Sequence, residues 1–381
     1  MKKLLALLLA SMMLLSMTAV FADVAQDVES AKELTHEELV QKAKAEEGTF
    51  IVYGNTSRIT TALEDFSKLY DIPGEGNNLK DAEIYTKLEI EIDGSAKGAD
   101  MVMIQDGASL IYMLNNDYLV NYLPAALAGS VAEDDQNPLV QQYINKLFIY
   151  SNIDDKVAPI KNVWALTEPA MKGNVIFKNP ETEQVNMNFL VMLTSDDWSD
   201  KLADAYKSYF GKDIELGDFK NAGYKWIAEF LSNSVFGSSD TSIAEEISQT
   251  TASGKIGLFV LSKLRSSSVL ADNLTVAQYD ASENNYTVEP FSGFIYPMYA
   301  LVSSGATRPY TAMLFIEYLM GAEGFAPWGK SIGAYSTNQD LVPLEGDLPI
   351  SVWKDSLVVE NPAYILENYE DVSTFVTKYL Q

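Results

Sequence analysis

The stretch from residue 50 to residue 58 constrains the fold more than any other part of the sequence. Phe50 to Tyr53 are four apolar residues in a row, two of them β-branched, which is typical of a buried strand in a parallel sheet. Gly54 then allows a turn, and residues 55–57 (Asn-Thr-Ser) are types that favour a helix N-cap. Residues 59–70 have apolar side chains at helical spacing. The pattern predicts a strand, a polar loop and a helix whose free N–H groups point out of the carboxyl end of the strand, where open α/β sheets bind ligands.

The same alternation continues along the chain. Strands are predicted at residues 99–104, 174–177, 254–260, 274–279 and 294–301, and helices at residues 184 onward, 198–210, 224–231, 311–320 and 363–380. Residues 236–241 predict a turn and an N-cap that lead into a further helix through Ser248. Residues 71–80 are rich in turn formers, and residues 84–92 fit a strand or a short helix. Such alternation predicts an α/β fold with parallel or mixed sheets. A chain of 381 residues has room for two cores.

The first 22 residues differ from the rest. Lys2 and Lys3 precede an apolar run, and Val20-Phe21-Ala22 provides small or permitted residues before a cleavage site. We therefore expect a signal peptide that is cleaved after Ala22, with a membrane anchor as the alternative. The chain has no cysteine, so it has neither disulfides nor thiolate metal sites, nor the cysteine that an ordinary lipoprotein would carry. We expect a periplasmic protein.

Charge and motifs exclude several classes of function. The formal net charge of −26 argues against nucleic acid and anionic membrane surfaces as partners. His36 is the only histidine, which disfavours Ser-His-Asp catalysis and histidine-rich zinc sites. Carboxylate pairs such as Asp134-Asp135 are compatible with an exported hydrolase, but nothing in the sequence selects one pair. We expect no catalytic residue, no bound metal and no cofactor, and hence a protein that is not an enzyme.

Polar residues follow most of the predicted strands, and most of these loops lead into helices. Hydroxyl, amide and charged groups therefore gather at strand ends without a nucleophile–base pair, as in a binding protein. The predicted ligand-binding residues are Asn55, Thr56, Ser57, Arg58, Gln105, Asp106, Thr182, Asn186, Ser238, Ser239, Ser262, Lys263, Arg265 and Tyr296.

The order of several segments carries a family resemblance across nearly the whole mature chain. These segments are residues 52–58 (Val-Tyr-Gly-Asn-Thr-Ser-Arg), 99–106 (Ala-Asp-Met-Val-Met-Ile-Gln-Asp), 164–169 (Trp-Ala-Leu-Thr-Glu-Pro), 172–173, 179–180, 253–257 (Ser-Gly-Lys-Ile-Gly), 312–324 and 333–338 (Gly-Ala-Tyr-Ser-Thr-Asn). The sequence resembles the extracytoplasmic solute-binding proteins of bacterial ABC importers. The similar branch includes ferric-ion, polyamine, thiamine, phosphonate and sugar-phosphate binders.

The resemblance implies a two-lobe periplasmic binding protein of type II, with mixed sheets and crossover hinge strands. Lobe one would comprise residues 48–125 and 292–336, lobe two residues 126–291 and 337–381, and residues 23–47 would form an N-terminal helical segment. It further implies a monomer that captures a small solute by hinge closure and delivers it to an ABC permease in the membrane. A sensory role for the same fold is an alternative.

The ligand is less constrained than the fold. Ferric-ion members of the family carry two adjacent tyrosines after the strand that matches residues 255–260, whereas residues 261–265 here read Leu-Ser-Lys-Leu-Arg. Lys263 and Arg265 would repel a bare cation and suit an oxyanion. We therefore favour an anionic organic solute or a chelated ferric ion. A polyamine- or thiamine-type cation is the alternative ligand, because Asp106, Glu181 and Glu183 lie near the same predicted loops.

Overall fold

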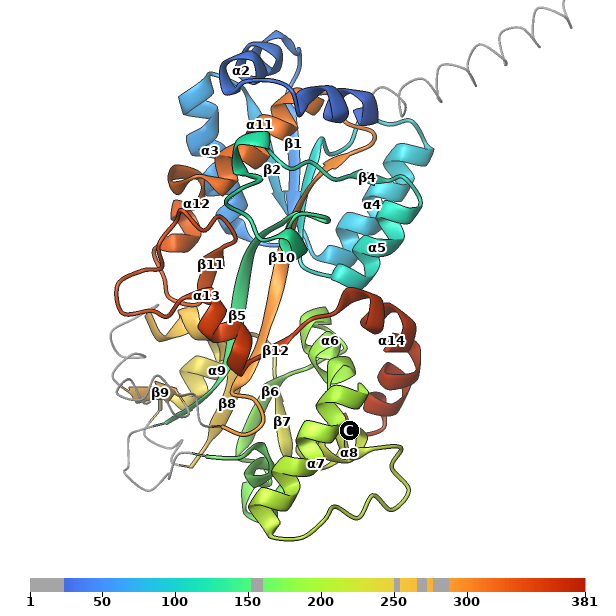
Figure 1. The fold of residues 1–381 in the computed structure, drawn as a ribbon, viewed down its shortest axis with the longest axis vertical. Coiled ribbons are helices and arrows are strands. Elements are labelled where there is room, and N and C mark those ends of the chain that lie inside the picture. Colours follow the sequence, from blue (N-terminus) through green and yellow to red (C-terminus); the bar gives the residue numbers. More distant parts are fainter. Residues whose placement is uncertain (1–23, 152–159, 250–253, 266–272, 277–287, 381) are drawn as a thin grey trace, which may run out of the picture. The chain divides into compact units, whose positions relative to one another are not determined.

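The computed structural model describes residues 24–151, 160–249, 254–265, 273–276 and 288–380, and the expected signal peptide lies outside this part (Figure 1). The chain divides into two compact units. Unit 1 comprises Met1–Gln142, Pro297–Lys330 and Ser336–Val342, and unit 2 comprises Tyr143–Tyr296, Ser331–Tyr335 and Pro343–Gln381. The chain passes from one unit to the other within β5 (Val140–Ser151) and β10 (Gly293–Ser303), and β11 (Ala334–Ser336) also has residues in both.

Unit 1 is built on a mixed sheet with helices on both sides (Figure 1). β1 (Phe50–Gly54) lies between β2 (Gly74–Asn78) and β3 (Met101–Ile104) and runs parallel to both. The end of β10 runs antiparallel to β3 and to β4 (Leu119–Val120). The helices are α2 (His36–Ala45), α3 (Ser57–Tyr70), α4 (Asp81–Asp93), α5 (Gly107–Asn115), α11 (Pro309–Met320) and α12 (Ala322–Gly329), with 3-10 turns η1 (Ala125–Leu127) and η2 (Glu133–Asp135). Residues 24–31 are also helical.

Unit 2 has its own core of parallel strands. β6 (Val175–Lys178) lies between β7 (Ser234–Gly237) and β8 (Ile256–Val260) and is parallel to both. β5 runs antiparallel to β8 and to β9 (Leu274–Val276), and β12 (Val358–Val359) pairs with the start of β10. The helices are α6 (Gln184–Met192), α7 (Asp196–Phe210), α8 (Ala222–Asn233), α9 (Asp240–Ile247), α13 (Ile350–Ser356) and α14 (Pro362–Thr377), with 3-10 turns η3 (Val163–Thr167), η4 (Pro169–Met171) and η5 (Leu261–Arg265). Within the described residues, no helix combines the length and the apolar character needed to cross a membrane.

Most predicted elements are confirmed, including the opening strand and its helix, which are β1 and α3. Residues 84–92 are helical and belong to α4. The prediction of turns throughout residues 71–80 was wrong, because residues 74–78 form β2. Its sequence, Gly-Glu-Gly-Asn-Asn, carries no apolar alternation, so only pairing with β1 makes it a strand. The glycines allow α3 to pack closely: a Cβ on Gly74 would lie 2.8 Å from Leu63 Cδ1.

A turn was also predicted at residues 236–241, but Phe236 and Gly237 complete β7. This strand is short, and its side chains are only partly buried, so the sequence lacks a continuous apolar signal there. The turn itself begins two residues later than predicted.

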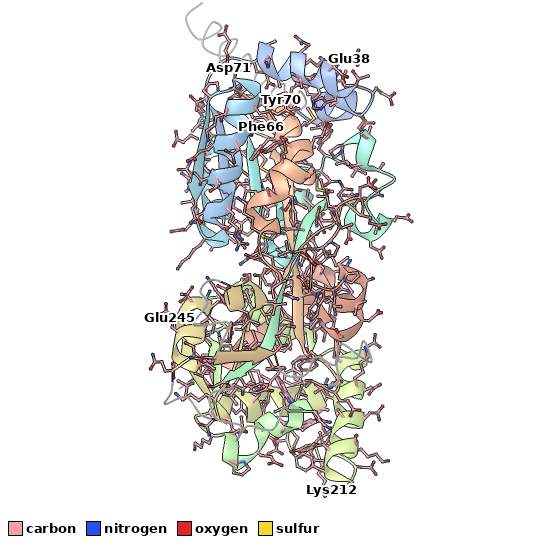
Figure 2. The ribbon with its side chains drawn as sticks, turned by 90° about the vertical axis from the view of Figure 1, so that its left-hand side faces the viewer. Glu38, Phe66, Tyr70, Asp71, Lys212 and Glu245 are labelled. Carbon is pink, nitrogen blue, oxygen red and sulfur yellow. The ribbon has the colours of Figure 1, made fainter. Side chains whose placement is uncertain are left out.

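Aromatic side chains hold the helices of unit 1 against its sheet. The Phe66 ring of α3 lies 6.2 Å from the Phe50 ring, 5.0 Å from the Phe315 ring and 4.8 Å from the Tyr70 ring, measured between centroids. Phe66 and Tyr70 are labelled in Figure 2, next to the carboxyl end of α3 at Asp71. Phe66 is fully buried and contacts both Phe50 of β1 and Phe315 of α11, so this one side chain joins α3 to the strand and to the other helix.

We expect Phe66→Ala to lower the free energy of unfolding of unit 1 by about 3–5 kcal/mol, because it opens a cavity in a packed aromatic cluster. Urea unfolding measures the change, with hydrogen exchange at β1 amides reporting on unit 1. Leu69→Ala is the matched control on the same helix, since the side chain of Leu69 is 54% exposed. Equal losses from both substitutions would contradict the assignment of Phe66 to the core.

Candidate ligand-binding site

In unit 1 the predicted ligand residues follow β1 and β3. Thr56 is the N-cap of α3, and its hydroxyl accepts the N–H of Arg58 at 3.3 Å. Ser57 is the first residue of that helix and is exposed. Gln105 and Asp106 lie between β3 and α5. Because β1 and β3 are parallel neighbours, their carboxyl ends bring these two loops to the same edge of the sheet.

Asp81 connects the two loops of unit 1. Its Oδ1 accepts a hydrogen bond from Asn55 Nδ2 at 2.8 Å, and its Oδ2 accepts the N–H groups of Gln105 at 3.3 Å and Asp106 at 3.1 Å. Asp81 was not predicted from the sequence, where it lies in the ambiguous region before residues 84–92. Its position at the start of α4 places a buried carboxyl group beneath both loops.

Asp106 is buried and caps α5. Its Oδ1 accepts the N–H of Ala108 at 3.2 Å, and its Oδ2 accepts the hydroxyl of Ser109. Both carboxylate oxygens of this predicted ligand residue therefore have partners within unit 1. Gln105 is partly exposed, and the roles of both residues toward a ligand stay predictions.

The protonation of Asp81 depends on its burial. Burial, and secondarily the charge of Asp106, raise the pKa of Asp81 to about 7, although the donors from Gln105, Asn55 and Asp106 favour the carboxylate. A carboxyl group with a raised pKa contributes its stability in full at acid pH, and this contribution is lost as the pH rises through the folded-state pKa.

We therefore expect the protein to lose stability relative to Asp81→Asn as the pH rises from about 4 to about 8, by on the order of 3 kcal/mol. Urea unfolding at pH 5 and pH 8, with hydrogen exchange at β1 and β3 amides, measures the difference. Glu89→Gln on the same helix is the control and should leave the pH dependence unchanged. A pH-independent difference between the protein and Asp81→Asn would show that Asp81 stays ionised.

In unit 2 a lysine–carboxylate cluster lies at the strand ends. It consists of Lys146, Lys178, Glu183, Asn186 and Asp240. Lys146 Nζ lies 3.3 Å from Glu183 Oε1, 3.5 Å from Asp240 Oδ1 and 2.9 Å from Asn186 Oδ1. Lys178 Nζ lies 2.5 Å from Glu183 Oε2 and 3.8 Å from Asp240 Oδ2. Each carboxylate thus contacts both ammonium groups.

The fold explains why these residues meet. Lys178 is the last residue of β6, Glu183 is the N-cap of α6, and Asp240 is the first residue of α9. Asp240 Oδ1 also accepts the N–H of Val260 at 3.2 Å, which joins the cluster to the end of β8. The parallel strands bring these loops to one edge, and β5 places Lys146 beneath them.

Burial and charge set the ionisation of the cluster. Lys146 is fully buried, and burial opposes its ammonium form, but the carboxylates of Asp240 and Glu183 outweigh this and raise the pKa of Lys146. For Glu183, burial is likewise outweighed by Lys146 and Lys178, so its pKa is lowered. The pKa of Asp240 is lowered in the same way, with a smaller contribution from the nearby Lys263. Lys146, Glu183 and Asp240 are therefore ionised at neutral pH.

We expect Lys146→Met to destabilise unit 2 by about 3 kcal/mol at pH 7, because two partly buried carboxylates lose a counter-ion. The lowered pKa values of Glu183 and Asp240 give stability that is present above about pH 4 and lost as the pH falls. The raised pKa of Lys146 gives stability that is lost only above about pH 10.5. The deficit of Lys146→Met should thus shrink below about pH 4.

Urea unfolding from pH 3 to pH 9 measures this deficit. Lys212→Met removes the same charge from an exposed position of unit 2, labelled in Figure 2, and should cost little at any pH. A deficit that does not change with pH would mean that lost packing, and not lost ion pairing, explains the effect of Lys146→Met.

The other predicted residues of unit 2 surround this cluster. Ser239 caps α9, and Ser238 contacts Ser242 at 3.2 Å. Thr182 is exposed and donates to the carbonyl of Asn179. Ser262 and Lys263 lie in η5 after β8, as does the backbone of Arg265, whose side chain falls outside the described part of the structure. Tyr296 is buried, with its ring centroid 5.8 Å from Lys146 Nζ.

Asn186 is fully buried and acts within the cluster. Its Oδ1 accepts the hydrogen bond from Lys146, and its Nδ2 donates to the carbonyl of Lys178 at 2.8 Å. Sequence reasoning did not select Lys146 or Lys178. The available signal was the lysine directly before the apolar residues 147–150 of β5 and another lysine at the end of β6, since a charge in a buried strand requires a partner.

Comparisons with solved structures identify the fold. A ferric-binding protein from Campylobacter jejuni matches with a TM-score of 0.66 and 13% identity, over 87% of this chain and 99% of that one. A Trichodesmium protein in complex with iron and citrate matches with a TM-score of 0.60 and 16% identity, over 87% of this chain and 99% of that one. The substrate-binding protein of an ABC transporter from Agrobacterium tumefaciens matches with a TM-score of 0.64 and 15% identity, over 89% of this chain and 96% of that one.

This chain has the fold of those binding proteins. The expected class, an α/β two-lobe periplasmic binding protein with a mixed sheet, is confirmed at the level of fold. No family model and no curated protein matches the sequence.

Proposed function

We propose that the chain is the solute-binding component of an ABC importer in the periplasm. The fold is shared over most of the chain with a substrate-binding protein of an ABC transporter and with ferric-binding proteins. These neighbours are binding proteins, and among the residues that the structure describes, the strand ends of both units present polar groups without a nucleophile–base pair. The chain would bind and deliver a solute without chemical change.

Our proposal for the ligand rests on the charge at the strand ends of unit 2. Lys146, Lys178 and Lys263 bring three positive charges, whereas Glu183 and Asp240 bring two negative charges. This group is therefore net positive in a chain whose net charge is −26. The N-terminus of α9 adds a partial positive charge at the same edge. An anionic solute fits this arrangement.

The anion is an organic acid, alone or as the chelator of a ferric ion. Lysine ammonium groups repel a bare ferric ion, but they suit the free carboxylates or phosphates of a complex. The similar Trichodesmium structure, which is a complex with iron and citrate ligands, supports this choice. A polyamine or thiamine would meet the net positive group of unit 2 unfavourably, so we do not favour it.

We assign the ligand contacts of unit 2 to Lys178, Lys263, Thr182, Ser238 and Ser239. Lys178 is the central contact, because its side chain is 16% exposed whereas Lys146 is fully buried. In unit 1 the loops after β1 and β3 supply Asn55 to Arg58 and Gln105. We further propose that the two units correspond to the two lobes expected from the family resemblance and that an ABC permease receives the ligand.

Thermal unfolding with a panel of solutes tests the proposal. The panel contains citrate, ferric citrate, a sugar phosphate, a phosphonate, thiamine and spermidine. A ligand at 100 times its Kd should stabilise the protein by about 2.7 kcal/mol. We expect stabilisation by an anion or by ferric citrate. Stabilisation by spermidine or thiamine alone would overturn the anion proposal, and measurable hydrolase activity without any stabilisation would overturn the binding function.

Lys178→Met tests the assigned site. We expect it to weaken binding of the stabilising anion about tenfold or more, because a charge-assisted hydrogen bond is lost. Isothermal titration measures the affinity, and unfolding of the ligand-free variant shows whether it is folded. Lys212→Met removes an equal charge from an exposed position of the same unit and should leave the affinity unchanged. Equal effects of the two variants would place the ligand elsewhere.

A further inference from the structure

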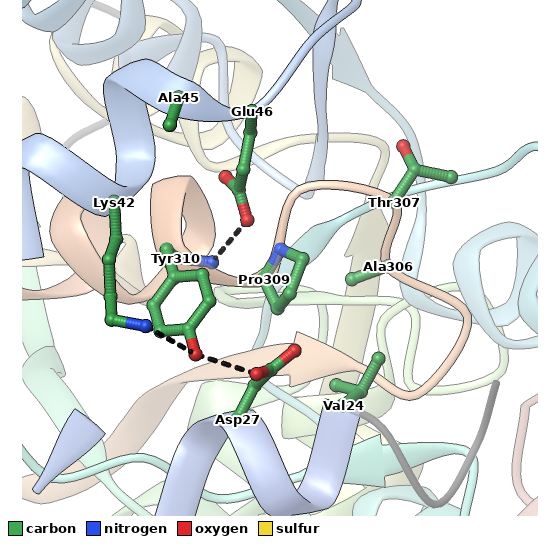
Figure 3. A pocket seen from close by; sticks show the side chains of 9 residues that line it. All are labelled: Val24, Asp27, Lys42, Ala45, Glu46, Ala306, Thr307, Pro309 and Tyr310. Atoms are coloured by element: carbon green, nitrogen blue, oxygen red, sulfur yellow. Dashed lines mark hydrogen bonds between the residues drawn. The ribbon is translucent and has the colours of Figure 1, made fainter. Parts of the chain in front are cut away.

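The charged groups that line a pocket of unit 1 are paired within the protein. This pocket has a volume of about 420 Å³ and lies between the N-terminal helical segment and α11 (Figure 3). Tyr310 Oη donates to Asp27 Oδ1 at 2.6 Å and accepts from Lys42 Nζ at 3.2 Å. Glu46 accepts the N–H of Tyr310 at 2.9 Å. These bonds join the segment to α11, and we assign no ligand to this pocket.

In unit 2, by contrast, a fully buried amide oxygen is not paired. Asn145 lies in β5, and its Oδ1 has no hydrogen-bond partner among the described residues. The Tyr335 hydroxyl donates to Asp347 Oδ1 at 2.9 Å, because a carboxylate only accepts, and its oxygen accepts from Asn145 Nδ2 at 3.2 Å. The amide nitrogen of Asn145 is thus committed to Tyr335, and its oxygen faces the other way. An unpaired buried acceptor is costly, so the reason for its retention lies in what surrounds it.

The unpaired oxygen of Asn145 faces Gly333 and the start of η5. Gly333 has a φ of +85°, and a Cβ at this position would lie 2.7 Å from Asn145 Oδ1, 2.9 Å from Leu261 Cβ and 3.2 Å from the Ser262 nitrogen. The N–H of Asn145 donates to the Gly333 carbonyl at 3.2 Å. Glycine fits between β5 and η5 both because of its backbone conformation and because a side chain has no room there.

Asp347 anchors the segment that contains Gly333. Its Oδ2 accepts the N–H of Gly333 at 2.9 Å, and its Oδ1 accepts the indole N–H of Trp353 at 3.3 Å as well as the Tyr335 hydroxyl. Trp353 is itself buried. The backbone of Gly333 is therefore held from two sides, by Asn145 and by Asp347, against the first residues of η5. Residues 333–335 thus form a support behind that turn.

The turn η5 carries a proposed ligand contact of unit 2. Lys263 lies in η5, and its charge is close enough to Asp240 to contribute to the lowered pKa of that carboxyl group. We propose that Gly333 and Tyr335 are positioning residues that hold η5, and with it Lys263, in place for the anionic solute. This role rests on the proposed function, in which Lys263 contacts the ligand. The unpaired oxygen of Asn145 is then a consequence of the close approach of Gly333.

Gly333→Ala tests the close approach to η5. The added methyl group should displace η5 and weaken citrate binding about fivefold or more, because Lys263 loses its hydrogen bond to the anion. Gly173→Ala is the matched control: Gly173 also lies in unit 2 with a φ of +78°, but nothing lies within 4 Å of its Cβ position. The two variants share similar backbone strain, so the contact with η5 is the main difference. Isothermal titration with citrate measures the affinity, and thermal unfolding shows whether each variant is folded.

A double-mutant cycle with Lys263→Met tests whether Gly333 acts through Lys263. In the Lys263→Met background we expect Gly333→Ala to leave the affinity for citrate unchanged, whereas independent effects would add. Tyr335→Phe removes only the hydroxyl group and should weaken citrate binding in the same non-additive way. A ligand-free measurement accompanies the cycle, namely the ¹³C NMR titration of the Asp240 carboxyl group. Its pKa should rise in Gly333→Ala as it does in Lys263→Met, and it should stay unchanged in Gly173→Ala.

The outcomes separate the positioning role from the proposed function. Equal citrate affinities of Gly333→Ala and Gly173→Ala, or additive effects of Gly333→Ala and Lys263→Met, would overturn the positioning role. Absence of citrate binding to the unsubstituted protein would count against the proposed function, and the titration of Asp240 then decides the positioning role without a ligand. An Asp240 pKa that is the same in Gly333→Ala as in the unsubstituted protein would overturn it.

Discussion

The ammonium group of Lys146 is the constraint on which the strand ends of unit 2 depend. It is fully buried within β5, and a buried charge is tolerated only with partners. Glu183 and Asp240 supply them from the start of α6 and the start of α9, and Asp240 is held in turn by the end of β8. One buried charge therefore determines where three loops lie, and these loops are the ones that we propose contact the ligand.

In unit 1 the loops at the strand ends are also held by a buried ionisable group, which is a carboxyl group. Asp81 lies beneath the loops after β1 and β3 and accepts hydrogen bonds from both. Unlike Lys146, it has no cation among the partners that set its pKa, so burial favours its neutral form. The polar loops of unit 1 are thus held by hydrogen bonds to a group that titrates near neutral pH, whereas those of unit 2 are held by ion pairs that persist across a wide pH range.

Charge is distributed unevenly over a strongly acidic chain. At the strand ends of unit 2, Lys146, Lys178 and Lys263 outnumber Glu183 and Asp240 by one, although the chain as a whole has a net charge of −26. Net charge alone therefore says little about the ligand, because the local groups decide which ion a site accepts.

The sequence by itself determined the α/β fold class and most of its strands and helices, because apolar periodicity and capping residues act over a few neighbouring positions. It also located the polar loops, as Thr56 and Ser239 show by capping their helices. Only the tertiary structure decided that residues 74–78 form a strand, since that strand depends on pairing with β1. It alone decided the partners of Lys146 and Asp81, because each contact joins residues far apart in the chain, and no local pattern records which distant residue will neutralise a buried charge.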